Sequence, residues 1–177
     1  MKPGSASTAS PVVLFARLLT LLLGMSLAGA WADDYTDVTQ LMRAGQLSEA
    51  RDRVERHLSA KPRDPQMRYF RGLIERESGQ TGAALATFTQ LTEDFPELPE
   101  PYNGLAVIHA AQGQYDQARS ALEAAVRANP AYAAAHENLG DVYLRLASQA
   151  YCKAMQYEPQ NPTAKSKQAQ TGTACRP

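Results

Sequence analysis

Three residue types recur at one fixed spacing, and this spacing constrains the fold more than any other feature of the chain. A glycine, an alanine and a proline each appear three times at intervals of 34 residues: Gly45, Gly79 and Gly113; Ala50, Ala84 and Ala118; Pro62, Pro96 and Pro130. Apolar residues between these positions fall at helical spacing, with the glycine ending one helix and the proline ending the next. The spacing therefore predicts successive pairs of short helices, each pair joined by a turn at its glycine.

A 34-residue period with glycine at the turn, alanine early in the second helix and proline at its end resembles the tetratricopeptide repeat family. The resemblance implies an all-α fold, a right-handed α-solenoid of antiparallel helix hairpins. Within the predicted domain, residues 33–159, it covers repeats at about residues 34–64, 65–98, 99–132 and 133–159. It also implies small residues where the two helices of a repeat approach closely, and these are Gly72, Ala106 and Gly140.

The fourth repeat departs from the period because it has no turn glycine. Pro159 stands five positions too early for the period counted from Pro130, and the missing positions fall between Tyr143 and Ala147. We therefore expect residues 133–157 to form one continuous helix, which would close the stack as an atypical cap. A tight turn at residues 144–146 is the alternative, and the good helix formers at those positions disfavour it.

Residues 1–32 have the features of a secretory signal peptide. Lys2 and Arg17 precede an uncharged run, Leu18 to Ala30, and small residues then favour cleavage before Asp33, with cleavage before Trp31 as a second candidate. The thirteen uncharged residues are fewer than the about 20 that a membrane-spanning helix needs. We expect an exported protein, periplasmic or secreted, with no stable membrane insertion after cleavage.

The charge balance excludes two classes of partner. The chain has 18 Lys and Arg against 18 Asp and Glu, and removal of the leader leaves a net charge of about −2. No basic run follows, so neither nucleic acid nor an anionic membrane surface is an expected partner. Residues 160–177 form a polar tail that we expect not to add to the core, although Asn161 and Pro162 have the pattern of a short helix start.

Histidine and cysteine are the obvious candidates for chemistry. His57, His109 and His136 fall at packing positions and are interpreted as structural, although His57 replaces a small residue that the resemblance implies. Either the second helix of that repeat then lies further from its neighbour, or the imidazole is left at an edge. No H-x-x-x-H pair, C-x-x-C pair or glycine-rich phosphate loop occurs, so no catalytic residue, cofactor or metal is predicted.

Two cysteines, Cys152 and Cys175, are expected to pair in an oxidising compartment. The bond would close a loop of about 22 residues and stabilise the folded chain by roughly 3 kcal/mol. The alternative is that Cys152 is a small buried apolar residue and Cys175 is incidental.

The resemblance also implies a binding surface on the first helix of each repeat. Mapping the family's positions onto this chain gives eight candidates: Tyr35, Tyr69, Leu73, Arg76, Asn103, Val107, Asn138 and Asp141. The family's clamp for a C-terminal carboxylate is not implied, because Tyr69 and Glu137 stand where lysine is expected.

The function implied by the resemblance is a non-catalytic scaffold or adaptor in the cell envelope that binds a partner peptide or helix. An accessory or regulatory subunit of a cell-wall enzyme complex and a self-associating structural protein are the alternatives. The sequence names neither the partner nor the oligomeric state.

Overall fold

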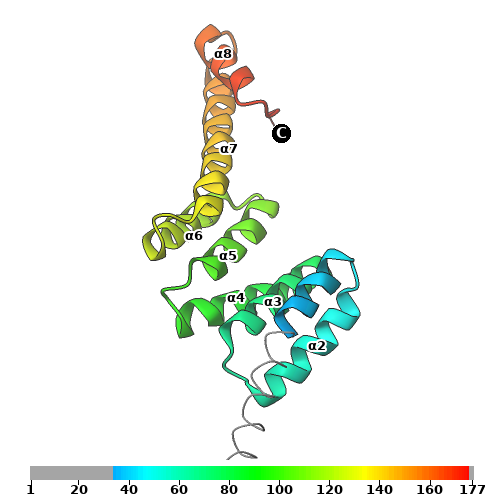
Figure 1. The fold of residues 1–177 in the computed structure, drawn as a ribbon. Helices are drawn as coiled ribbons and strands as arrows, with labels where there is room; N and C mark the ends of the chain where they lie inside the picture. The colour runs from blue at the N-terminus through cyan, green and yellow to red at the C-terminus, as the bar shows by residue number, and fades with distance from the viewer. Residues whose placement is uncertain (1–33, 176–177) are drawn as a thin grey trace, which may run out of the picture. The chain divides into compact units, whose positions relative to one another are not determined.

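The computed structural model describes residues 34–175, which form helices and turns with no strand in that range (Figure 1). The predicted leader and both candidate cleavage sites lie outside the described residues. The first helix covers residues 34–43. The others are α2 (Leu47–Ala60), α3 (Pro65–Glu77), α4 (Thr81–Asp94), α5 (Pro99–Ala111), α6 (Tyr115–Ala128), α7 (Ala133–Tyr157) and α8 (Pro162–Gln170). The prediction of an all-α fold is confirmed.

The chain divides into two compact units, one up to His57 and one from Leu58 onward. In the first unit, side chains of α2 hold the helix of residues 34–43. Arg53 Nε lies 3.5 Å from Asp34 Oδ1, and Arg53 Nη2 pairs with Asp37. Ion pairs between the two helices therefore fix how this hairpin closes.

His57 is buried within the first unit, with 3% of its surface exposed. Its Nδ1 lies 3.1 Å from Asp34 Oδ2, and its ring centroid lies 5.5 Å from that of Tyr35. The expectation that the imidazole could be left at an edge is therefore wrong, because a carboxylate and an aromatic ring from the preceding helix surround it.

The repeated glycines end their helices in the same backbone conformation. Gly45, Gly79 and Gly113 have φ of 72°, 75° and 75°, where glycine alone avoids steric strain. The Gly79 N–H donates to the Arg76 carbonyl at 3.0 Å and the next N–H, of Gln80, donates to the Glu75 carbonyl at 2.8 Å. These two bonds form a Schellman motif, which satisfies carbonyls that the helix end would leave unpaired. The same bonds recur after Gly45 and Gly113.

Each repeated proline stands two residues beyond the end of a helix: Pro62 after α2, Pro96 after α4 and Pro130 after α6. Proline is common at this distance from a helix end because it cannot continue the helix. In the second unit, consecutive helices from α3 to α8 pack against each other, and α5 also packs against α3 and α7. The first helices of successive repeats are therefore neighbours.

Two clusters of buried residues lie in the core of the second unit. One consists of Ala84, Phe88, Leu91 and Ile108, and the other of Ala106, Ala118, Leu122, Ala125, Ala135 and Val142. The alanines at the predicted repeat positions are almost fully buried: Ala84 and Ala118 are 0% exposed and Ala106 is 1% exposed. Small side chains therefore occupy the places where helices approach closely.

Phe88 of α4 lies between two glycines of neighbouring helices. A Cβ added at Gly72 of α3 would lie 2.5 Å from Phe88 Cε1, and one added at Gly104 of α5 would lie 2.9 Å from Phe88 Cε2. No side-chain carbon fits at these distances without movement of the ring. The two glycines thus form a slot that holds one aromatic ring across two successive repeats.

The fourth repeat has the predicted continuous helix, since α7 runs unbroken over 25 residues. Gly140, however, does not have the role predicted for it. It is exposed, and an added Cβ would meet nothing within 4 Å. The prediction of a close approach at Gly140 is wrong because a continuous α7 supplies no second helix to pack against it.

The C-terminal segment is attached to α7 covalently and by packing. Cys152 of α7 and Cys175 form a disulfide with a Cα–Cα distance of 5.6 Å. Asn161 caps α8, its side chain accepting a hydrogen bond of 2.9 Å from the Ala164 N–H. Ala164 is 6% exposed. The tail was expected to add nothing to the core, but the capped helix brings one small apolar side chain against α7.

The slot around Phe88 leads to a first prediction, in which one substitution has opposite effects at two glycines. Gly72→Ala should lower the free energy of unfolding by about 1 to 3 kcal/mol, because the new methyl group overlaps the ring. Gly82→Ala, at an exposed position of α4, should raise it by about 0.5 to 1 kcal/mol, because alanine is the better helix former and an added Cβ would meet nothing within 4 Å. Urea denaturation followed by circular dichroism measures both, and a loss of stability in both variants would contradict the structure.

Candidate functional site

The predicted binding residues of the second unit lie on the first helices of successive repeats. They are Tyr69, Leu73 and Arg76 on α3, Asn103 and Val107 on α5, and Asn138 and Asp141 on α7. We call this set the α3/α5/α7 face. Tyr35, the eighth predicted residue, belongs to the first unit, where its ring lies against His57.

Two carboxamides of this face are joined across neighbouring helices. Asn138 Nδ2 on α7 donates a hydrogen bond of 2.7 Å to Asn103 Oδ1 on α5, and the pair is partly buried. After this bond, Asn103 keeps both of its N–H donors, while Asn138 keeps one N–H and its carbonyl oxygen. The pair can therefore hold its own geometry and still offer donors and an acceptor to a ligand.

Tyr69 forms the aromatic part of the face. It is partly buried, and its ring centroid lies 5.7 Å from that of Phe88. Burial, followed by the neighbouring Tyr132, raises the pKa of the Tyr69 hydroxyl to about 12, while Arg76 acts to lower it and Glu100 to raise it. The hydroxyl is therefore a neutral hydrogen-bonding group at physiological pH.

Two further residues, Glu100 and Tyr132, belong to the surroundings of Tyr69. Burial raises the pKa of Tyr132, and the charge of Glu100 adds to this effect. Neither residue was among the predicted binding positions: Glu100 lies in the first turn of α5, and Tyr132 is the N-cap of α7. The sequence signal that would have pointed to them is their place at the start of two consecutive first helices, α5 and α7.

The apolar residues of the face differ in how strongly the core holds them. Leu73 is half-buried and packs against the cluster around Phe88, while Val107 is half-buried and belongs to neither core cluster. Arg76 is partly exposed, with Nη2 3.4 Å from Glu77 Oε1, and Asp141 is exposed. The face thus combines an apolar centre with polar ends.

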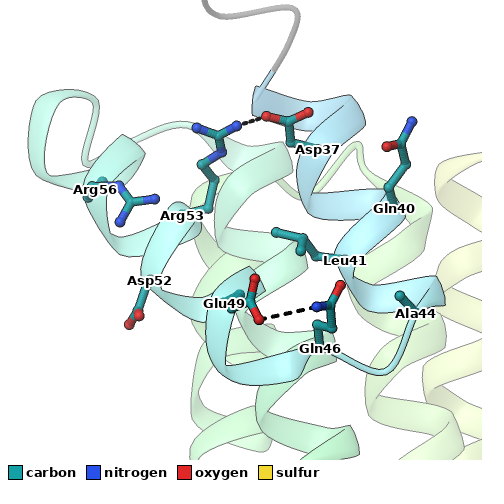
Figure 2. Close-up of a pocket in the computed structure, with 9 residues that line it drawn as sticks. All are labelled: Asp37, Gln40, Leu41, Ala44, Gln46, Glu49, Asp52, Arg53 and Arg56. Atoms are coloured by element: carbon teal, nitrogen blue, oxygen red, sulfur yellow. Dashed lines mark hydrogen bonds and ion pairs between the residues drawn. The ribbon is translucent and has the colours of Figure 1, made fainter.

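A pocket of about 580 Å³ lies on the first unit, and none of the predicted binding residues lines it (Figure 2). It is lined by Asp37, Gln40, Leu41, Ala44, Gln46, Glu49, Asp52, Arg53 and Arg56. Figure 2 shows Arg53 directed at Asp37 and Gln46 directed at Glu49. Gln46 Nε2 donates a hydrogen bond of 3.2 Å to Glu49 Oε1. The lining carries three acidic and two basic side chains, so the pocket offers a ligand little net charge.

The histidines outside the first unit bond to nearby turns. His109 Nδ1 lies 2.7 Å from Gln114 Oε1, and His136 Nε2 lies 2.9 Å from the Pro130 carbonyl oxygen. Across residues 34–175, no three His, Cys, Asp or Glu side chains gather as metal ligands would. In the same range, no helix has the length and apolar character needed to span a bilayer.

Solved structures with this fold include two tetratricopeptide repeat proteins. The crystal structure of TTC0263, a thermophilic repeat protein of Thermus thermophilus, is 26% identical with a TM-score of 0.59, over 78% of this chain and 79% of that chain. The first tetratricopeptide repeat domain of human RPAP3 is 16% identical with a TM-score of 0.59, over 65% of this chain and 91% of that one.

Sequence similarity extends to a curated protein of Pseudomonas putida KT2440, named as the probable biofilm formation methyltransferase WspC. The two chains are 34% identical over 91 residues, which is 51% of this chain but 22% of that protein. Two family models, both described as tetratricopeptide repeat, match residues 35–101 and 75–139. Together they span more than half of the chain, in the segment that carries the repeated glycines, alanines and prolines, and so the chain belongs to the tetratricopeptide repeat family.

Proposed function

We propose that this chain is a non-catalytic adaptor that binds an extended segment of a partner protein along the α3/α5/α7 face. Tetratricopeptide repeats are protein–protein interaction modules, and helical repeats commonly bind partners on the surface formed by equivalent helices. The observation that carries the proposal is the bond between Asn103 and Asn138, which arranges free amide groups across two repeats.

The chemistry of the face fits a peptide backbone. An extended peptide presents alternating N–H and C=O groups, and the asparagine pair offers both donors and an acceptor to them. Val107, one turn from Asn103 on α5, supplies half-buried apolar surface for an aliphatic side chain. Tyr69 adds aromatic contact area with little loss of conformational entropy, since Phe88 already restrains its ring.

We also propose that the chain acts outside the cytoplasm, in the cell envelope. The charged, apolar and small-residue regions of the leader support this location. A disulfide between Cys152 and Cys175 is typical of an oxidising compartment and supports it independently. An N-terminus at Asp33 or Trp31 in the purified native protein would establish export.

A role as an accessory subunit of an enzyme complex is the second candidate. Its support is the similarity to 22% of a protein named as a probable methyltransferase, most of which lies outside the match. The two candidates share the binding face and differ in the identity of the partner.

A substitution in the apolar centre tests the proposal. Val107→Asp should weaken capture of the partner at least about tenfold, because the ligand's aliphatic group would then bury a carboxylate. Capture from envelope extract by the immobilised protein, followed by mass spectrometry, gives the retained partner and its amount. Ala83→Asp, on an exposed position of α4, is the matched control and should capture as the unchanged protein does. Equal capture by all three proteins, with unchanged thermal melts, would place the binding surface elsewhere.

A further inference from the structure

The large apolar side chains that the described residues leave exposed all lie on α7. Tyr143 and Leu144 are each 49% exposed, and Tyr157 is 78% exposed. Another side of the same helix is buried, because Leu139, Val142 and Leu146 pack against the core of α5 and α6. Among the described residues, a helix that already buries one side therefore also exposes a second group of apolar side chains.

The second apolar side has the spacing of a helix–helix seam. Exposed or half-buried residues follow one another at intervals of three and four: Gly140, Tyr143, Ala147, Ala150, Ala154 and Tyr157. We call this set the α7 seam. Alternating intervals of three and four keep residues on one stripe when two helices pack side by side at a small angle. His136, which is exposed and lies one turn before Gly140, extends the stripe toward the start of the helix.

The missing turn explains why, within residues 34–175, no second helix of a hairpin covers this stripe. In the preceding repeats, α3 packs against α4 and α5 against α6, but α7 continues where the turn would have been. Ala147 and Ala154 have the same spacing as Ala118 and Ala125, the alanines that are 0% exposed in α6. The second half of α7 therefore carries the pattern of a pairing helix, yet it cannot fold back onto the first half.

We propose that the α7 seam pairs with the α7 seam of a second copy of this chain, antiparallel and along the whole helix. The second half of each α7 then covers the first half of the other, which makes a two-fold symmetric interface. Full overlap of residues 133–157 brings the following residues together: Tyr157 with Ala133, Ala154 with His136, Ala150 with Gly140, and Ala147 with Tyr143. Three of these pairs set an aromatic ring against a single methyl group, and the fourth combines the two smallest residues.

The charges of α7 favour the antiparallel direction. Residues 133–144 carry Glu137 and Asp141 and no Lys or Arg, whereas residues 145–157 carry Arg145 and Lys153 and no Asp or Glu. Antiparallel pairing sets each acidic half beside a basic half, and the opposed helix dipoles also attract. A parallel pair would set like charges together. Asn138 bonds to α5 on another side of α7, so the α3/α5/α7 face stays available in the pair.

Sedimentation equilibrium on the full chain tests the pairing. The unchanged protein should show twice the mass of one chain, and Ala150→Glu should show the mass of one chain, because two carboxylates would enter the seam beside Gly140. Ala86→Glu, on an exposed position of α4, is the matched control and should keep the doubled mass. A single-chain mass for the unchanged protein across its accessible concentrations would overturn the proposal.

Cross-linking tests the register without depending on how Ala150→Glu folds. Gly140→Cys and Ala150→Cys proteins, mixed and oxidised, should form a disulfide between chains, found as one linked peptide by mass spectrometry. Each variant alone should give no such link, because residue 140 of one copy faces residue 150 of the other. Absence of the link in the mixture, or equal linkage in either variant alone, would overturn the antiparallel seam. Partner capture by the α3/α5/α7 face is measured separately, so failure of one proposal leaves the other intact.

Discussion

Replacing Phe88 with alanine is expected to lower the free energy of unfolding by about 3 to 5 kcal/mol. The ring is 0% exposed and lies between Gly72 of α3 and Gly104 of α5. Neither glycine has a side chain that could move into the vacated space, so most of the cavity should persist. Because the ring contacts helices of two successive repeats, both should be weakened at once. Urea denaturation followed by circular dichroism gives the free energy.

The control for this substitution is another phenylalanine of the same hairpin. Phe95, at the C-cap of α4, is only partly buried, so Phe95→Ala should cost less than Phe88→Ala. A double substitution provides a stricter test. Gly72→Ala and Phe88→Ala should together cost less than the sum of their separate effects, because the new methyl group lies where the ring was. Additive losses would mean that the ring and the glycine do not share one slot.

Removing the disulfide is the second substitution with a large expected effect. Cys152→Ser together with Cys175→Ser should reduce the stability of α8 and the residues after it by roughly 3 kcal/mol, the value that loop closure gives for a separation of 23 residues. Little else holds this segment, since Ala164 is the buried apolar residue of α8. Hydrogen exchange of the α8 amides should become faster, while the amides of α3 to α6 should exchange as before.

Reduction of the unchanged protein with a thiol reagent is the matched control for the serine variant. It removes the same bond without changing a side-chain shape, so α8 should lose the same protection. Protection of α8 that survives both treatments would show that packing on α7, rather than the cross-link, holds the segment. Loss of protection throughout α3 to α6 would show that the cross-link stabilises the whole second unit.

The parts of the fold that depend on local chemistry could be predicted from the sequence. A glycine one period after another glycine predicts the same turn, because the left-handed conformation and its hydrogen bonds involve only neighbouring residues. The absence of that glycine between Tyr143 and Ala147 predicted the continuous α7 for the same reason. Buried alanines at Ala84 and Ala118 also follow from register, since the spacing alone places them at the centre of the helix pairs.

The parts that depend on tertiary contacts could not be predicted. The role of Gly104 comes from the Phe88 ring on a different helix, α4, and the residues beside Gly104 in the sequence do not indicate that contact. The bond between Asn103 and Asn138 joins residues 35 apart in the sequence, so it depends on how α5 and α7 pack against each other. Gly140 was assigned from register alone, although its role required a helix that the missing turn had removed.

The three glycine turns also determine how an array of this kind can change in length. Because Gly45, Gly79 and Gly113 share one backbone conformation, each hairpin leaves its turn in the same direction relative to its own first helix. Copying residues 65–98 in tandem would therefore add a hairpin whose ends match those of its neighbours, and it would lengthen the surface by one repeat. A copy of α7 would not add a matching hairpin, because α7 lacks the turn and is tied covalently to Cys175. Duplication can therefore lengthen the array at a hairpin that has the glycine turn, but not at α7.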